Sequence, residues 1–448
     1  MGKKLGLGII GILVVGVIYY FTAGAELITE KIKAQVNKEL SSLREQGFSV
    51  QKEVYQQASK EEKEHFTLSF DNPQKISNFF ISQGAQLTVK DIEMLKGLTL
   101  GVDISYQQDV YSAVSFDLYP LTLPDSFMQS PRFTPEDKTL LQLQEMLKKK
   151  TFLVHVDINK LGSGFKGYIK DIHEVFHGDN DTTVSLKNLT YTGELKNSKL
   201  KSVTQNMQHF SMHTPNKLQM TLANLKATYM LTGDTLYDYN TNYNIEEIVF
   251  DANKAIKVHL NHLQVQSNSN VTNTLASGTM NSKVKSILID TKSEKYTLKT
   301  LVFELGAKNL DIHALDKLQK IGASNEKEVN ILLQKLLSNT LSFGIPAFSV
   351  ASIEQNDKKM EGFELNAKVG INKPLDIKAL QANPMSAISA INAHLNLNLS
   401  KELYELIAQQ PQAMMALMLF QPKDVKGKKS YEVDLKDGKL LVNGSPVF

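Results

Sequence analysis

Alternation of apolar and polar residues with a period of two runs through most of the chain beyond about residue 86. The segment LTLGVDISYQ, for example, places Leu98, Leu100, Val102 and Ile104 on one side. Successive side chains of a strand point to opposite faces, so this pattern predicts antiparallel strands with one face solvated or lining a cavity. Clusters of Gly, Asn and Asp between these segments are typical of turns.

Helical periodicity replaces the alternation in four places. Apolar residues three and four apart predict helices within 26–47, 135–150, 313–341 and 401–420. The first of these carries an apolar stripe that needs a partner, either the globular domain or a second copy of the chain. The stripe consists of Ile28, Ile32, Val36, Leu40 and Leu43.

These patterns predict the α+β class: an N-terminal transmembrane helix, then a long, mostly antiparallel β-sheet region with packed helices, arranged as two lobes. The expected division is a cytoplasmic tip and transmembrane anchor at 1–25, a helical stalk at 26–50, an N-terminal α+β lobe at 51–230 and a C-terminal α+β lobe at 231–448.

The transmembrane prediction depends on an uncharged run of 21 residues, from Leu5 to Ala25, that follows two lysines. About 20 apolar residues are needed to cross a bilayer as a helix, and lysines before the span favour a cytoplasmic N-terminus. We therefore expect a single-pass protein of the bacterial inner membrane with the rest of the chain in the periplasm. Residues typical of such an anchor are Leu5, Ile9, Leu13, Val17, Tyr20 and Phe21.

A cleaved signal peptide is the alternative interpretation of this segment, because Ala23-Gly24-Ala25 has the small-x-small form of a cleavage site. The apolar run from Leu5 to Phe21 is longer than the usual core of a signal peptide, which favours a retained signal anchor. Cleavage at Ala25 stays open at this point, and either interpretation implies export.

Composition excludes several classes of function. The chain of 448 residues has no cysteine, which excludes disulfides, thiolate chemistry and cysteine-bound metals. Its formal net charge is +3, and Arg44 and Arg132 are its only arginines. Because base and phosphate recognition commonly uses arginine, we expect no nucleic-acid partner.

The segment HEVFH matches the H-E-x-x-H zinc pattern at His173, Glu174 and His177. Zinc hydrolysis needs this motif on a helix, where both imidazoles share a face and the Glu activates a bound water. Here the motif lies between alternating segments, so we expect a strand in which Glu174 points away from both histidines. His173 and His177 remain weak metal candidates, with Glu194 the nearest plausible third ligand.

The segment GSGFKG matches the dinucleotide fingerprint at Gly162, Gly164 and Gly167. A functional fingerprint follows a buried parallel strand and opens a helix, whereas the residues after this one look extended. The pairs His209/His213 and His259/His262 also lie in alternating stretches. We therefore predict no catalytic residues, no cofactor and no metal, and we expect that the protein is not an enzyme.

Several segments resemble the YdgA family of bacterial inner-membrane-anchored periplasmic proteins, also described as domain of unknown function 945. They are LGSGFKGYIKDI leading into VSLKNLTYTGEL, then LGAKNLDIHALDKL, INAHLNLNLSKELYEL and the final KSYEVDLKDGKLLVNGSPV. The sharpest residues of the likeness are Asp437, Gly438, Asn443 and Gly444. The resemblance implies a self-associating envelope protein with no assigned biochemical activity. The strand-rich plan is also loosely similar to AsmA-type envelope proteins, whose long sheets are thought to shield lipids.

The functional expectation is a membrane-anchored, β-rich periplasmic protein of the cell envelope that binds lipid or another apolar ligand along a groove of its sheet. The alternative is an envelope scaffold that binds other proteins or forms a homodimer through the sheet edge and the stripe at 26–47. A zinc hydrolase based on HEVFH is the third hypothesis. The sequence does not identify the ligand.

Overall fold

The computed structural model divides into two compact units, Met1–Met230 and Leu231–Phe448. It describes residues 29–53, 63–82, 89–106, 110–128, 138–178, 180–196, 199–253, 255–320, 326–337, 341–373, 375, 377, 380, 383, 388–410 and 420–447. The expected membrane segment, Leu5–Ala25, lies outside these residues. Among those described, none of the helices combines the length and the apolar character that crossing a membrane requires.

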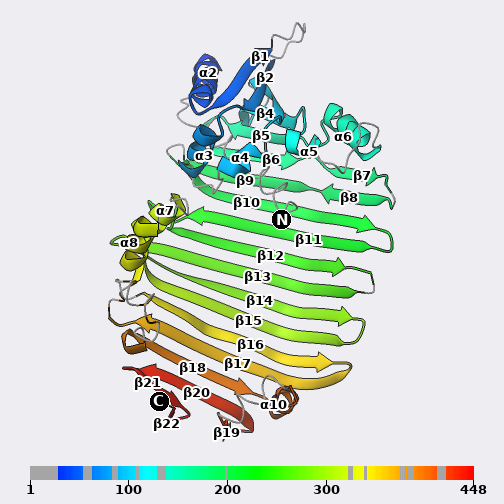
Figure 1. Ribbon diagram of the computed structural model, residues 1–448. Coiled ribbons are helices and arrows are strands. Elements are labelled where there is room, and N and C mark those ends of the chain that lie inside the picture. The colour runs from blue at the N-terminus through cyan, green and yellow to red at the C-terminus, as the bar shows by residue number, and fades with distance from the viewer. Residues whose placement is uncertain are drawn as a thin grey trace. The chain divides into compact units, whose positions relative to one another are not determined.

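The first unit is built on an antiparallel sheet in which β1, β2, β3, β4, β5, β6, β9, β10 and β11 follow one another, while β7 pairs with β8 and β8 with β10 (Figure 1). The strands are β1 (Phe48–Glu53), β2 (Lys63–Phe70), β3 (Thr99–Tyr106), β4 (Ser112–Pro120), β5 (Val154–Asn159), β6 (Gly164–Ile169), β7 (Ile172–Phe176), β8 (Thr182–Lys187), β9 (Leu189–Lys196), β10 (Lys199–Thr214) and β11 (Leu218–Leu231).

Helices bury one face of this sheet. A single large cluster joins alternate residues of the strands, such as Ile104 and Phe116, to apolar residues of the first three helices. Val36, Leu40 and Leu43 of the predicted stripe belong to that cluster, so the domain itself covers this part of the stripe. The helices are α2 (Thr29–Glu45), α3 (Pro73–Ser82), α4 (Val89–Glu93), α5 (Asp125–Met128) and α6 (Lys138–Lys148).

The second unit is an antiparallel sheet of longer strands, in which β12 to β18 pair in sequence order and β20 follows β18. The far edge of β20 pairs with both β19 and β21, and β21 pairs with β22. The strands are β12 (Tyr239–Asp251), β13 (Ile256–Thr272), β14 (Leu275–Thr291), β15 (Lys295–Asp311), β16 (Ser342–Gln355), β17 (Lys358–Ile371), β18 (Ile391–Leu399), β19 (Lys423–Val425), β20 (Lys428–Lys436), β21 (Lys439–Val442) and β22 (Ser445–Pro446).

Tight turns join several of these strands. Between β20 and β21, Asp437 and Gly438 have φ values of 50° and 80°, and between β21 and β22, Asn443 and Gly444 have 55° and 83°. Positive φ at both central residues defines the type I′ hairpin turn, whose twist matches that of paired strands. Both turns are therefore two-residue hairpin turns, and the four sharpest residues of the family resemblance are turn residues.

The helices of the second unit include α7 (Ile312–Lys320), α8 (Glu326–Leu337) and α10 (Lys401–Ala408). Ser400 caps α10 by accepting a hydrogen bond from the backbone of Leu403, and its hydroxyl donates to the carbonyl of Glu361 on β17 at 2.7 Å. This contact fixes α10 against one part of the sheet. Helices α7 and α8 pack mainly on each other.

In each of six neighbouring strands of the second sheet, β12 to β17, one residue is left out of the cross-strand pairing. In each strand the apolar residues have even numbers on one side of the unpaired residue and odd numbers on the other side. Ile353 and Val350 are three residues apart, yet both are buried in one cluster. The same face of the sheet therefore stays apolar on both sides of this line, which we term the skip line. Its residues are Glu246, His262, Lys285, Thr300, Ala351 and Gly362.

The predicted α+β class is wrong. Strands account for 60% and helices for 20% of the structure, so this is a mainly β protein with antiparallel pairing. Helices predicted at 135–150, 313–341 and 401–420 are present as α6, α7 with α8, and α10. They are short, however, and do not form a layer comparable to the sheets, because backbone pairing of long strands organises most of the chain.

Candidate functional site

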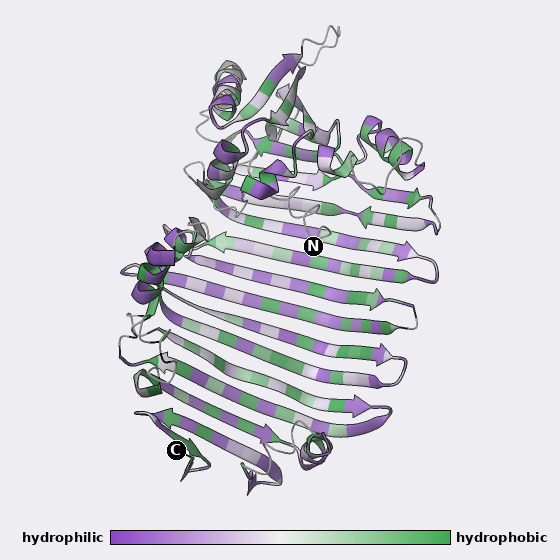
Figure 2. Ribbon diagram, viewed as in Figure 1, coloured by the Kyte–Doolittle hydropathy of each residue, from purple (hydrophilic) through white to green (hydrophobic). Residues whose placement is uncertain are grey.

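Apolar and polar residues alternate along the strands of the second unit (Figure 2). The strand pairing places the apolar ones on one face of the sheet, across up to eight strands, from β12 to β18 and β20. Residues directly opposite one another in a ladder lie on the same face. Three such cross-strand rows lie side by side, and we term them together the apolar face. The first is Ile248, Leu260, Ile287, Leu298, Ile353 and Met360; the second is Ile245, Leu263, Val284, Leu301, Val350, Phe363 and Leu399; the third is Tyr243, Val265, Ser282, Phe303, Phe348, Leu365, Leu397 and Tyr431.

Aromatic contacts join the rows to one another. The ring of Phe348 meets Phe303 at 5.6 Å and Phe363 at 5.0 Å between centroids, in both cases edge to face. This geometry is favourable for aromatic pairs. Since Phe363 belongs to the second row and the other two to the third, both rows share one face.

Most of the apolar face is only partly covered. Within the described residues, α10 packs over Val350, Met360 and Leu399 and buries that part. Away from α10 the side chains are intermediate or exposed, except that of Val284, which is buried. Leu305, Phe343 and Val369 continue the same face and are 39%, 46% and 42% exposed. A contiguous exposed apolar surface of this kind marks a binding site more often than a scattered apolar residue does.

The opposite face of the same sheet is polar. The row next to the aromatic one runs through Asn244, Gln264, Lys283, Val302, Ser349, Glu364, Asn398 and Ser430. This contrast between the two faces is what alternation with a solvated side predicts. The sheet thus has one hydrophilic face and one apolar face, whose exposure to water is unfavourable.

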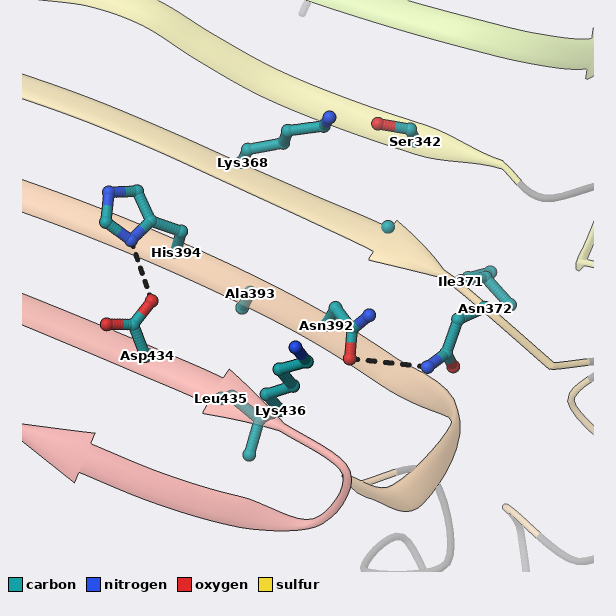
Figure 3. A pocket seen from close by; sticks show the side chains of 11 residues that line it. Ser342, Lys368, Ile371, Asn372, Asn392, Ala393, His394, Asp434, Leu435 and Lys436 are labelled. Carbon is teal, nitrogen blue, oxygen red and sulfur yellow. Dashed lines mark hydrogen bonds and ion pairs between the residues drawn. The ribbon is translucent and has the colours of Figure 1, made fainter. Parts of the chain in front are cut away.

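A shallow hollow of about 390 Å³ lies on the polar face near the ends of β17, β18 and β20. Its side chains include Lys368, Asn392, His394, Asp434 and Lys436 (Figure 3). The Nδ1 atom of His394 lies 2.8 Å from Oδ1 of Asp434. Both groups are substantially exposed.

His394, Glu432 and Asp434 also have ligand atoms within 4.8 Å of one another, which is close enough for a metal ion. Lys368 is the direct cross-strand neighbour of His394, on the side away from Asp434. An ammonium group beside the ligands disfavours a cation there.

The first unit carries a separate polar row on the face away from its core. His65, Asp103, Asp117 and His155 are cross-strand neighbours on β2, β3, β4 and β5. Two carboxylates directly opposite each other repel, and each here has a histidine on its other side. The Nδ1 atoms lie 2.5 Å from Asp103 and 2.7 Å from Asp117, respectively.

Hydrogen bonds shift the charge states of this row. Burial by itself raises the pKa of Asp103, but hydrogen bonds from Lys150, His65 and Tyr119 outweigh it and hold the pKa below its ordinary value. The hydrogen bond to Asp117 raises the pKa of His155, against the opposing effect of burial. The row therefore favours a charged Asp103 and a protonated His155.

The row does not assemble an activated nucleophile. The hydroxyl of Ser115 donates to Asp157 at 2.5 Å, and the two ring nitrogens of His155 face Asp117 and Asp157. General-base catalysis would need the imidazole within reach of the serine oxygen. This cluster is arranged as mutually neutralising charges on the sheet surface.

The structure places HEVFH on β7, which confirms the predicted strand. His173 is exposed and lies opposite Ser185, and His177 approaches Asp181 at 3.2 Å. Glu194 is on β9, where its neighbours are Gly164 and Ser202 and its carboxylate pairs with Lys201. The metal-compatible group found in the described chain does not include these histidines.

The segment GSGFKG forms a turn and the start of β6, not the start of a helix. Gly162 has φ 63° in the turn, and Gly167 lies where a Cβ atom would come within 2.1 Å of the carbonyl oxygen of His155. The hydroxyl of Tyr191 donates to that same carbonyl at 2.7 Å. Close packing of backbone and tyrosine explains Gly167 without a nucleotide.

The other histidine pairs are also on strands. His209 and His213 lie on β10, and His259 lies on β13, where its Nε2 approaches Glu247 at 2.8 Å. His262 is a skip-line residue with φ 51°. The sequence analysis missed the apolar face as a unit, although the phase change in each strand of β12 to β17 was a visible signal for it.

Comparisons of the chain with protein-family models, with curated proteins and with solved structures find no match. The resemblance to the YdgA family therefore stays a prediction from the segments quoted above.

Proposed function

We propose that the protein binds lipid acyl chains on the apolar face of its second unit. The observation that carries this proposal is the run of three apolar rows, which span six, seven and eight paired strands and are only partly buried away from α10. Removing apolar surface from water contributes roughly 25 cal/mol per Å², so covering this face with hydrocarbon is favourable. A flexible, linear ligand can extend over a wide sheet and contact more of its surface than a compact ligand can.

The dimensions of the face support this ligand class. Neighbouring strands lie about 4.8 Å apart, so the third row from β12 to β16, outside the part that α10 buries, extends roughly 19 Å. The hydrocarbon core of a bilayer, made of two opposed acyl layers, is about 30 Å thick. A single acyl chain can therefore lie along a row with its whole length in contact with apolar side chains.

The proposed location is the periplasmic side of a bacterial inner membrane. Support comes from the sequence alone: the uncharged run Leu5–Ala25 and the lysines before it. A tether of this kind would keep the apolar face within reach of lipid. We propose no enzymatic step, because the polar row of the first unit consists of mutually neutralising charges.

Photochemical labelling tests the proposal. The full-length protein is reconstituted in phosphatidylcholine nanodiscs that contain a phosphatidylcholine with a diazirine in its acyl chain. After irradiation, mass spectrometry should find labelled peptides from β15, β16 and β17. The substitution Leu305→Gln should lower that labelling several-fold, because it places an amide on the apolar face. Gln264→Ser, on the polar face, is the matched control and should leave labelling unchanged.

Labelling confined to residues 5–25 would contradict the proposal. Native mass spectrometry on the same sample distinguishes the alternative scaffold function, since a second copy could cover the same apolar face. A lipid-free dimer that Leu305→Gln converts to monomer would replace lipid binding with self-association.

A further inference from the structure

The hollow on the polar face of the second unit has two cationic side chains from different strands, Lys368 of β17 and Lys436 of β20 (Figure 3). Within the described part of the chain, neither forms an ion pair with a carboxylate. Some of the other described lysines of this unit do, including Lys299 with Glu354 and Lys428 with Glu364. The hollow therefore concentrates positive charge that its surroundings do not neutralise.

Neutral hydrogen-bonding groups complete the lining. Asn372 donates through Nδ2 to Oδ1 of Asn392 at 3.3 Å, which leaves the Nδ2 group of Asn392 available as a donor. Ser342 adds a hydroxyl, and Lys308 is the cross-strand neighbour of Ser342. Donors thus reach the hollow from β16, β18 and the end of β17.

Glycines keep the floor of the hollow low. Gly370 lines it, and Gly306 and Gly344 face each other across β15 and β16 on the same side. None of the three has positive φ, and a Cβ atom at Gly370 or Gly306 would meet nothing closer than 3.9 Å. Neither backbone conformation nor internal packing requires glycine at these two positions. Gly306 and Gly344 flank a bulge between β15 and β16, whereas Gly370 lies in regular pairing with both neighbouring strands. A strand glycine without a bulge is typical of a place where a ligand approaches the backbone.

The charge balance favours an anion over a cation. Asp434 is the acidic side chain of the lining, and His394 engages it at 2.8 Å. Glu432 belongs to the next cross-strand row, opposite Asn396. Two ammonium groups with amide and hydroxyl donors suit a doubly charged oxyanion, and lysine binds phosphate as a point charge.

We propose that this hollow binds a phosphate group, held by Lys368 and Lys436 and by the amide of Asn392 over the floor made by Gly370. The group belongs either to a soluble phosphorylated compound or to a lipid headgroup. The site is separate from the apolar face, since Lys368 and Gly370 alternate along β17 with the apolar Val369.

The test uses the full-length protein in phosphatidylcholine nanodiscs, titrated with inorganic phosphate at constant ionic strength and followed by ³¹P NMR. We expect saturable binding that Lys368→Gln and Lys436→Gln each weaken about tenfold, through loss of one charge-assisted hydrogen bond. Gly370→Val should also abolish binding, because it fills the floor without changing charge. Lys283→Gln removes an exposed lysine elsewhere on the polar face and should have no effect.

Nanodiscs that also contain phosphatidic acid distinguish the two sources. Displacement of inorganic phosphate by that lipid identifies a headgroup ligand, and unchanged binding identifies a soluble one. Circular dichroism verifies that each variant is folded. Absence of saturable binding, or equal affinity in the wild type, Lys368→Gln and Lys436→Gln, would overturn the proposal.

Discussion

The first unit buries one face of its sheet under three helices, whereas the second leaves most of its apolar face only partly buried. In the first unit, most strands are short and a single large cluster connects strands with helices. In the second, strands of 13 to 17 residues carry the sheet from β12 to β17, and its buried clusters are small. Packing dominates the stability of the first unit, while backbone ladders contribute a larger share in the second.

The largest expected difference between the units comes from truncating an apolar side chain. Ile104→Ala should destabilise the first unit by about 4 kcal/mol, because Ile104 is fully buried and its removal leaves a cavity. Leu298→Ala on the apolar face should cost the second unit only about 1 kcal/mol, since that side chain is already partly in water. Hydrogen exchange followed by mass spectrometry reports each unit separately. Equal losses of hydrogen-exchange protection in the two variants would show that the stability of both units depends on side-chain packing to the same extent.

A glycine comparison should give the next largest effect. Gly167→Ala forces a methyl group against the carbonyl of His155 and the ring of Tyr191, and overpacking of this kind costs about 3 kcal/mol. Gly306→Ala in the second unit meets open space and should change stability by less than about 0.5 kcal/mol. Urea unfolding of the two variants measures this. A destabilised Gly306→Ala would mean that the sheet surface at Gly306 is tightly packed.

A polar substitution on the apolar face should separate binding from stability. Phe343→Ser removes a side chain that is 46% exposed, so the second unit should lose less than about 1 kcal/mol. Acyl-chain labelling of β16 should nevertheless fall several-fold. Labelling yield and thermal unfolding are measured on the same preparation. Intact labelling with this variant would show that the ligand contacts another part of the sheet.

The smallest effect concerns pH. The pKa of His155 is raised in the folded state, chiefly by its hydrogen bond to Asp117. Its contribution is therefore complete below the unfolded pKa, near 6.5, and is lost as pH rises through the higher folded pKa. Calorimetry should show the first unit losing stability between about pH 6 and pH 8. His155→Gln should flatten this dependence, while His394→Gln in the second unit should not alter it.

Local patterns predicted the individual elements well. Alternation located strands such as β3 and β13, and three-and-four spacing located α2 and α6. The α+β class was wrong because periodicity shows where a helix forms but not how much of the fold it covers. The lengths of the paired strands, not the presence of helices, decided the class.

The sites were harder to predict, because they depend on register. His155 and Asp117 are 38 residues apart and meet only through the pairing of β4 with β5. The lysines of the hollow come from two strands that are separated by β18 in the sheet. No local spacing encodes such neighbours. HEVFH and GSGFKG, by contrast, match local patterns but lie on strands that cannot perform the matching chemistry.

The skip line has a consequence for the evolution of the second unit. The unpaired residues of β12 to β17 lie opposite one another across the sheet. An insertion or deletion in one of these strands therefore disturbs its pairing with the neighbouring strands. Loss of His262 alone would move Leu263 one position along the ladder, so that it faced Lys285 of β14 instead of Val284. Viable length changes are therefore confined to the hairpin turns, and relatives of this chain should vary in loop length while conserving the number of residues on each side of the line.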